Sequence, residues 1–144
     1  MPELAEMRAR LAESKPQTNH WNAKDGPGRL QDIDLFAQAA SLRTGGVATD
    51  TRAQIAAGQS DGWLTEEEAE TLYKAHTLFW TVHASARLLT GGVFDPETAG
   101  TGAIEMLLRE ASMQTLDALK IETETAAKAA EQVIIAKLAG ETGG

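Results

Sequence analysis

The sequence predicts an all-α fold, a bundle of about five to six helices joined by short Gly-rich connections. Apolar side chains recur every three or four residues along most of the chain, which is the period of one face of an α-helix. The sequence has no sustained alternation of apolar and polar residues, the pattern of a half-buried strand, and few β-branched clusters. Glycine pairs and prolines separate the periodic stretches, as expected at helix ends and turns.

The first half of the chain contains three predicted helices. Between the first and the second lies a polar, turn-rich segment with one large apolar side chain, Trp21, which we expect to anchor it. Thr49 or Asp50 is suited to cap the third helix, since both side chains can accept a hydrogen bond from a first-turn amide. The three helices are expected at residues 3–14, at 30–43 before the glycine pair Gly45-Gly46, and at a short stretch through Ala57.

The second half begins with the clearest helix of the sequence. Thr65 and Glu68 form the spacing of a capping box, and the helix that follows is apolar on much of its circumference until Gly91-Gly92. This helix is therefore predicted to be central and the most buried. Further helices are expected at 103–110 and at 112–139, with Gly140 as the stop, and the pattern leaves open whether they form one kinked helix or two.

Composition and charge indicate one globular domain. With 42% hydrophobic residues, 144 residues suffice for a real core, and we divide them into residues 1–29 (first helix and Gly/Pro loop), 30–140 (bundle core) and 141–144 (frayed tail). The net charge of -8 argues against nucleic acid and anionic membrane surfaces as partners. The absence of cysteine fits a reducing compartment, and no apolar run has the length of a membrane span. A cytoplasmic protein is expected.

The stretch from Lys24 to Gln38 organises the rest of the chain. It begins as a turn rich in glycine and proline and runs directly into an amphipathic helix. A helix N-terminus preceded by cations is suited to hold an anionic group, so Lys24, Gly28 and Arg29 are candidate ligand contacts. Two glycines and two cations are a weak signal by themselves, and from these residues alone a structural turn is the favoured interpretation.

Residues 28–35, GRLQDIDL, resemble the Gly-Gly-Leu-Arg-Asp-Ile-Glu-Phe signature of the bacterial glutamine synthetase adenylyltransferase family. The nitrogen-signalling uridylyltransferases carry a related version. The resemblance extends to residues 6–10, 21–28 and 58–89, and so covers most of the chain. Among the positions that differ, Arg29 stands for the usual second Gly, Gln31 for the usual Arg and Asp34 for the usual Glu.

The resemblance implies a C-terminal helical domain that follows a nucleotidyltransferase core. That core would transfer AMP between ATP and a tyrosine of glutamine synthetase, with Mg²⁺ held by carboxylates outside this chain. The implied partners are the core, glutamine synthetase and a nitrogen-regulatory protein, and the chain alone is expected to be inactive. The residues implied in contacts with substrate, nucleotide or the core are Lys24, Gly28, Arg29, Asp32 and Asp34.

Asp32 and Asp34 also allow a structural interpretation. Residues two apart on a helix project about 200° from each other, so these carboxylates are not expected to chelate one ion. They either complement the helix dipole and cap loop amides or contact a neighbouring catalytic domain, and both interpretations stay open.

No catalytic residue and no metal ligand is predicted in this chain. His76 and His83 stand two turns apart, whereas a helical metal site needs closer spacing and a third ligand, so both are expected to be packed histidines. A helical metalloenzyme is therefore disfavoured. The alternative function is a non-catalytic, acidic helical module derived from the same scaffold that binds a protein.

Overall fold

The computed structural model describes residues 2–14, 19 and 21–142, and in these residues it contains helices and no strand. The predicted all-α bundle is confirmed. Its six helices are α1 (Pro2–Ser14), α2 (Leu30–Arg43), α3 (Thr51–Ser60), α4 (Glu66–Thr90), α5 (Thr101–Glu110) and α6 (Leu116–Thr142).

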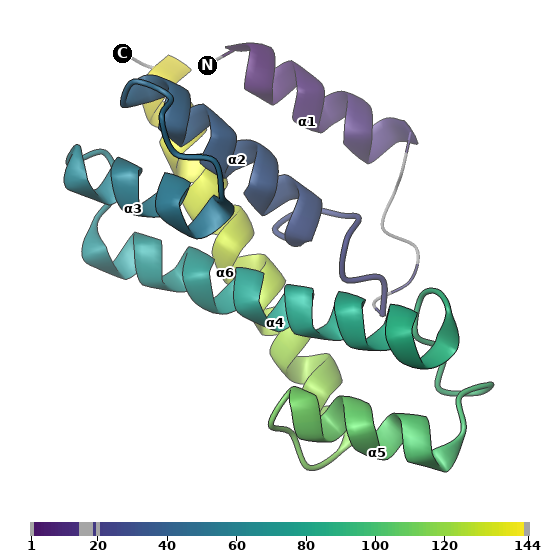
Figure 1. Cartoon of the computed structure of the whole chain (residues 1–144). Coiled ribbons are helices and arrows are strands. Elements are labelled where there is room, and N and C mark those ends of the chain that lie inside the picture. The colour runs from purple at the N-terminus through teal and green to yellow at the C-terminus, as the bar shows by residue number, and fades with distance from the viewer. Residues whose placement is uncertain (1, 15–18, 20, 143–144) are drawn as a thin grey trace.

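Helix α4 is the centre of the bundle, as predicted. It packs against α2, α3, α5 and α6, while α2 packs mainly against α3, and α1 lies over α2 and α6 (Figure 1). The buried apolar side chains of α4 form a stripe along the face that points toward these helices. Side chains from α2, α5 and α6 complete one continuous core with it. The fully buried side chains include Ile33, Phe36, Leu72, Phe79, Leu107, Leu119 and Ile134.

Part of the apolar circumference of α4 lies on the outside of the bundle. Trp80 and Leu88 lie off the buried stripe and are 57% and 86% exposed. The reason is geometric, since α4 has neighbours on only part of its circumference along its second half. These two side chains leave an apolar surface on the outside of the bundle.

The helix ends follow local signals. Asp50, one of the two predicted caps, accepts a hydrogen bond from the Ala53 amide at 2.9 Å. Thr65 and Glu68 form the predicted capping box, with bonds of 3.1 and 2.9 Å. Gly91 ends α4 with a left-handed φ of 80°. These caps satisfy backbone groups that would otherwise lack partners.

The question of one or two C-terminal helices is settled by a break at Ser112. Helix α5 begins at Thr101, two residues before the predicted start, and ends at Glu110. Helix α6 begins at Leu116 rather than at Ser112, because Ser112 has a left-handed φ of 58° that no helix accommodates. At its other end α6 continues to Thr142, past the predicted stop at Gly140; residues 143–144 of the predicted tail lie outside the described residues.

Within the described residues, no helix combines the length and the apolar composition that crossing a bilayer requires.

Candidate functional site

Residues 21–29, which precede α2, form an ordered turn anchored by Trp21, as predicted, whereas residues 16–18 and 20 of the predicted loop lie outside the described residues. The Trp21 ring is buried edge-on against Phe94, with 5.1 Å between ring centroids. The Asn22 side-chain oxygen accepts bonds from the amides of Lys24 and Asp25, both at 3.1 Å. This arrangement gives the turn a defined shape before the chain enters α2.

Gly28 is the point of closest approach between this turn and α6. Its φ is +71°, and a Cβ atom built there would lie 1.9 Å from the Ala127 carbonyl oxygen and 2.9 Å from the Glu131 nitrogen. Only glycine fits a left-handed position against a neighbouring backbone. The structure thus places Gly28, a predicted ligand contact, in an intramolecular contact.

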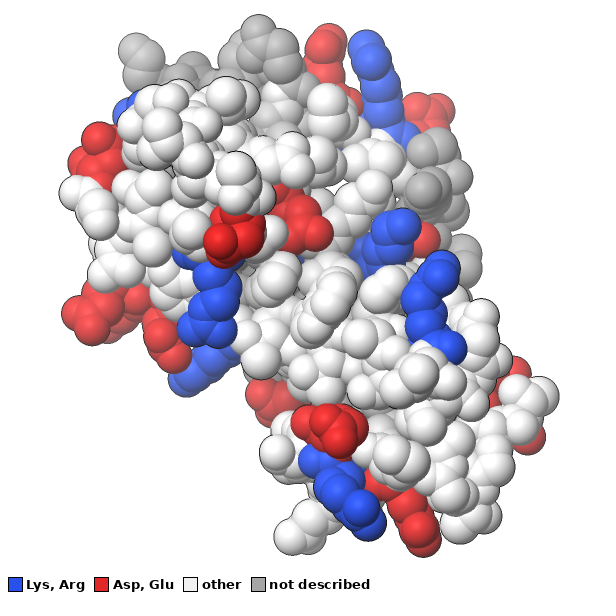
Figure 2. All heavy atoms as spheres, in the orientation of Figure 1, with Lys and Arg blue, Asp and Glu red and all other residues white. Residues whose placement is uncertain are grey.

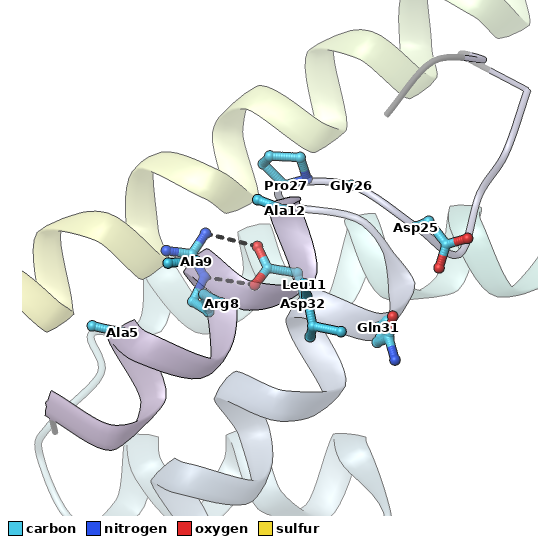
Figure 3. A pocket seen from close by; sticks show the side chains of 10 residues that line it. All are labelled: Ala5, Arg8, Ala9, Leu11, Ala12, Asp25, Gly26, Pro27, Gln31 and Asp32. Atoms are coloured by element: carbon cyan, nitrogen blue, oxygen red, sulfur yellow. Dashed lines mark hydrogen bonds and ion pairs between the residues drawn. The ribbon is translucent and has the colours of Figure 1, made fainter. Parts of the chain in front are cut away.

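Asp32 holds the turn and α1 together. Its carboxylate accepts two bonds from Arg8 (2.6 and 2.9 Å) and one from the Gly28 amide (2.8 Å). Asp32 is only 8% exposed, and its hydrogen bond to Arg8 raises the pKa of that guanidinium, with burial acting in the opposite direction. Figure 3 shows the two bonds at the wall of a groove of about 260 Å³ between α1 and the turn. We call Arg8, Gly28 and Asp32 the clamp.

Arg29 lies on another side of the turn and is 5% exposed. Its guanidinium carbon stands 5.2 Å from the centre of the Phe79 ring, and Nη1 donates to the Asn22 carbonyl oxygen at 2.9 Å. Burial lowers the pKa of this guanidinium, while the charge of Glu124 opposes the shift. Arg29 therefore fastens the turn to α4 through a cation–π contact.

Asp34 faces away from the clamp, as the helical geometry predicts. Its Oδ1 atom accepts from the Thr51 hydroxyl at 2.6 Å and lies 3.1 Å from His76 Nε2. The Asp34 side chain is 38% exposed, so it links α2 to α3 and α4 while remaining accessible. His76 has a hydrogen-bonding partner, as expected of a packed histidine.

Lys24 is exposed and borders a crevice that also contains His83 and Arg87 of α4. The five predicted contact residues are therefore not one site. Gly28 and Asp32 meet in the clamp, Arg29 packs on α4, and Lys24 and Asp34 lie on separate accessible faces. Within the described residues, no three His, Asp or Glu side chains gather as metal ligands would.

Sequence reasoning missed the role of Arg8 in the clamp. The available signal was a charged residue at an apolar position of the predicted helix 3–14. Such a residue on a buried face requires a partner of opposite charge. Because Asp32 is 24 positions away from Arg8, the local sequence does not indicate which carboxylate is that partner.

Comparison with known proteins agrees with the family resemblance of the sequence. The family model described as GlnD PII-uridylyltransferase matches residues 3–93. Proteins named bifunctional glutamine synthetase adenylyltransferase/adenylyl-removing enzyme are similar over most of the chain. The relative from Rhodopseudomonas palustris (strain HaA2) is 28% identical over 98% of this chain and 15% of its own length. The one from Bradyrhizobium diazoefficiens is 27% identical over 96% of this chain and 14% of its own.

A third relative with this name, from Bartonella quintana (strain Toulouse), is 30% identical over 83% of this chain and 12% of its own length. The chain thus spans only a small part of the curated relatives that it matches. No solved structure matches it. Because the family model covers more than half of the sequence, the chain belongs to the family described as GlnD PII-uridylyltransferase and is a helical domain of that nucleotidyltransferase family.

Proposed function

We propose that this domain packs against a nucleotidyltransferase core and helps to position its protein substrate or nucleotide. The reaction of the whole enzyme would be transfer of AMP to or from a tyrosine of glutamine synthetase, with ATP and Mg²⁺ bound by the core. The similarity to relatives named glutamine synthetase adenylyltransferase, which extends across the signature and most of the chain, carries this proposal.

The geometry of the signature supports a division of roles. Gly28, Arg29 and Asp32 are buried, Arg8 is half-buried, and all four are bound within the domain. They therefore act as positioning residues that fix the turn between α1, α4 and α6. Lys24 and Asp34 remain accessible on either side of it. Of the five residues predicted as contacts, only Lys24 and Asp34 are therefore left to contact the core or its substrates.

The apolar surface of α4 supports docking to another protein surface. Trp80 and Leu88 are both exposed on its second half. Figure 2 shows a broad, largely uncharged area over this part of α4 and its junction with α5, although the domain carries a net charge of -8. An exposed tryptophan is typical of the centre of a protein interface. We assign this face to the core.

The first test is the activity of the isolated chain. Incubated with glutamine synthetase, Mg²⁺ and labelled ATP, it is expected to transfer no AMP to the tyrosine, and adenylylated glutamine synthetase is expected to keep its AMP. Label in the acceptor above a no-protein control would contradict the proposal, because the chemistry would then reside in these 144 residues.

The second test places the chain in an enzyme. It replaces the matching segment of the Rhodopseudomonas palustris (strain HaA2) relative, and AMP transfer is measured with the same assay. Substituting Trp80→Ser is expected to lower transfer by the chimera through lost docking, whereas Thr77→Ser, an exposed control on the same helix, is expected to leave it unchanged. If the isolated domain instead captures glutamine synthetase or a nitrogen-regulatory protein while the chimera stays inactive, the alternative of a non-catalytic interaction module is favoured.

A further inference from the structure

A crevice of about 170 Å³ lies between the Trp21 turn, the end of α4 and the segment that follows it. Trp21 and Phe94, which contact each other edge-on, belong to its apolar lining. Sites for drug-sized ligands are larger, about 300–1,000 Å³. The crevice therefore suits a group of a few atoms.

Four ionisable side chains line this crevice: Lys24 and Asp25 from the turn, and His83 and Arg87 from α4. In the described part of the chain, neither the Lys24 ammonium nor the Arg87 guanidinium has a hydrogen bond or an ion pair, unlike Arg8 and Lys137. Arg87 lies in the last turn of α4, where the negative end of the helix dipole stabilises a cation. Lys24 belongs to no helix, so a helix dipole does not account for its position. Lys24 and Arg87 are therefore both available to an anion at this crevice, although the chain carries a net charge of -8.

The charges at this crevice affect how readily His83 binds a proton. Burial lowers the pKa of His83, and the positive charges of Arg87 and Lys24 lower it further, while Asp25 acts in the opposite direction. One Asp25 oxygen accepts from the Asn22 amide at 3.1 Å, and the other is buried without a partner. If an anion neutralised Lys24 and Arg87, the remaining influence of Asp25 would favour the protonated imidazole.

We propose that this crevice binds a tetrahedral oxyanion, phosphate either free or as the monoester of a small molecule, between Lys24 and Arg87, and that binding is coupled to proton uptake by His83. The apolar lining from Trp21 and Phe94 would face the rest of a monoester. The site requires no catalytic core, so it can be tested on the isolated chain and stands or falls separately from the proposed function.

The experiment uses sulfate as the first probe, because sulfate does not titrate near neutral pH and any proton taken up belongs to the protein. Binding is followed by the NMR signals of the His83 imidazole and by calorimetry in buffers of different ionisation enthalpy. Ionic strength is held constant with chloride. We expect a saturable shift of the His83 signals and net proton uptake.

Charge-removing variants locate the site. Lys24→Met and Arg87→Met are each expected to weaken sulfate binding roughly tenfold, the usual value of a charged hydrogen bond. Lys128→Met removes an exposed cation on α6 and is expected to leave binding unchanged. Equal binding by all three variants, or a shift that chloride reproduces at the same ionic strength, overturns the proposal.

The pH dependence of sulfate binding tests whether His83 takes up a proton when the anion binds, or whether the anion only screens the charges of the crevice. Binding is expected to raise the pKa of His83. The affinity for sulfate should therefore rise as the pH is lowered from the His83 pKa of the bound state to the His83 pKa of the empty crevice. His83→Gln is expected to bind sulfate with a flat pH profile and no proton uptake; uptake that persists in this variant contradicts the coupling. Tighter binding of ribose 5-phosphate than of inorganic phosphate indicates a monoester, and equal binding indicates the free ion.

Discussion

Gly28 and Ser112 have similar left-handed backbones, with φ of 71° and 58°, but the two turns that contain them are held in different ways. The turn at Gly28 is fixed by tertiary contacts with α1, α4 and α6. The turn at Ser112 is fixed by its own backbone, because the Ser112 amide donates to the Arg109 carbonyl (3.1 Å) and the Met113 amide to the Leu108 carbonyl (2.8 Å). At residue 28 the left-handed conformation therefore requires glycine, because the backbone of α6 leaves no room for a side chain. At residue 112 the same conformation is stabilised by local backbone hydrogen bonds and accommodates a serine.

The largest effect is expected for Gly28→Ala. A methyl group at this position meets the backbone of α6 and also occupies a left-handed φ, so the free energy of unfolding should fall by about 2–5 kcal/mol. Gly46→Ala is the matched control, because its φ is +73° and its nearest atom is a Leu42 side-chain carbon at 3.6 Å. It should lose only the conformational part, about 1–2 kcal/mol. Denaturant titration compares the two; equal losses would mean that α6 moves away at little cost.

The clamp should show the next largest effect. Asp32→Ala leaves the Arg8 guanidinium and the Gly28 amide without their buried partner, and we expect a loss of about 3 kcal/mol in the free energy of unfolding. Asp34→Ala, two residues along the same helix, removes bonds at a half-exposed position and should cost about 1 kcal/mol or less.

A double-mutant cycle sharpens this contrast. Combining Asp32→Ala with Arg8→Ala should cost less than the sum of the single changes, with a coupling of about 1–3 kcal/mol in the free energy of unfolding. Additive losses would show that Arg8 and Asp32 act independently and that α1 is not held through this pair.

A smaller effect is expected where a helix end relies on local bonds. Thr65→Ala removes the side chain that caps α4 and should lower the free energy of unfolding by about 1 kcal/mol. Thr71→Ala is a suitable control, since Thr71 lies within α4 and its hydroxyl bonds only to the preceding turn. A loss at Thr65 as large as that at Asp32 would contradict the distinction between local and tertiary devices.

The same distinction explains what the sequence could predict. The caps at Asp50, Thr65 and Gly91 are signals within four residues of the groups they satisfy, and each was found. The partners of Asp32 and Asp34 lie far along the chain, at Arg8 and His76, so the sequence predicted where these carboxylates stand on the helix and not what they bind. The α5–α6 break was left open because its left-handed residue is a serine, and neither Gly nor Pro marks it.

That serine provides the smallest predicted effect, and the one with the opposite sign. Ser112 follows the last turn of α5 at the position where glycine is usual in this helix-ending arrangement. Ser112→Gly should therefore raise the free energy of unfolding by about 0.5–1 kcal/mol, because relief of the left-handed strain exceeds the added freedom of the unfolded chain. Ala111→Gly, at a right-handed φ of -83°, should instead lower it by about 0.5–1 kcal/mol. Thermal unfolding of both variants measures the difference, and a Ser112→Gly variant less stable than the native chain would show that the serine side chain, rather than the backbone alone, holds this turn.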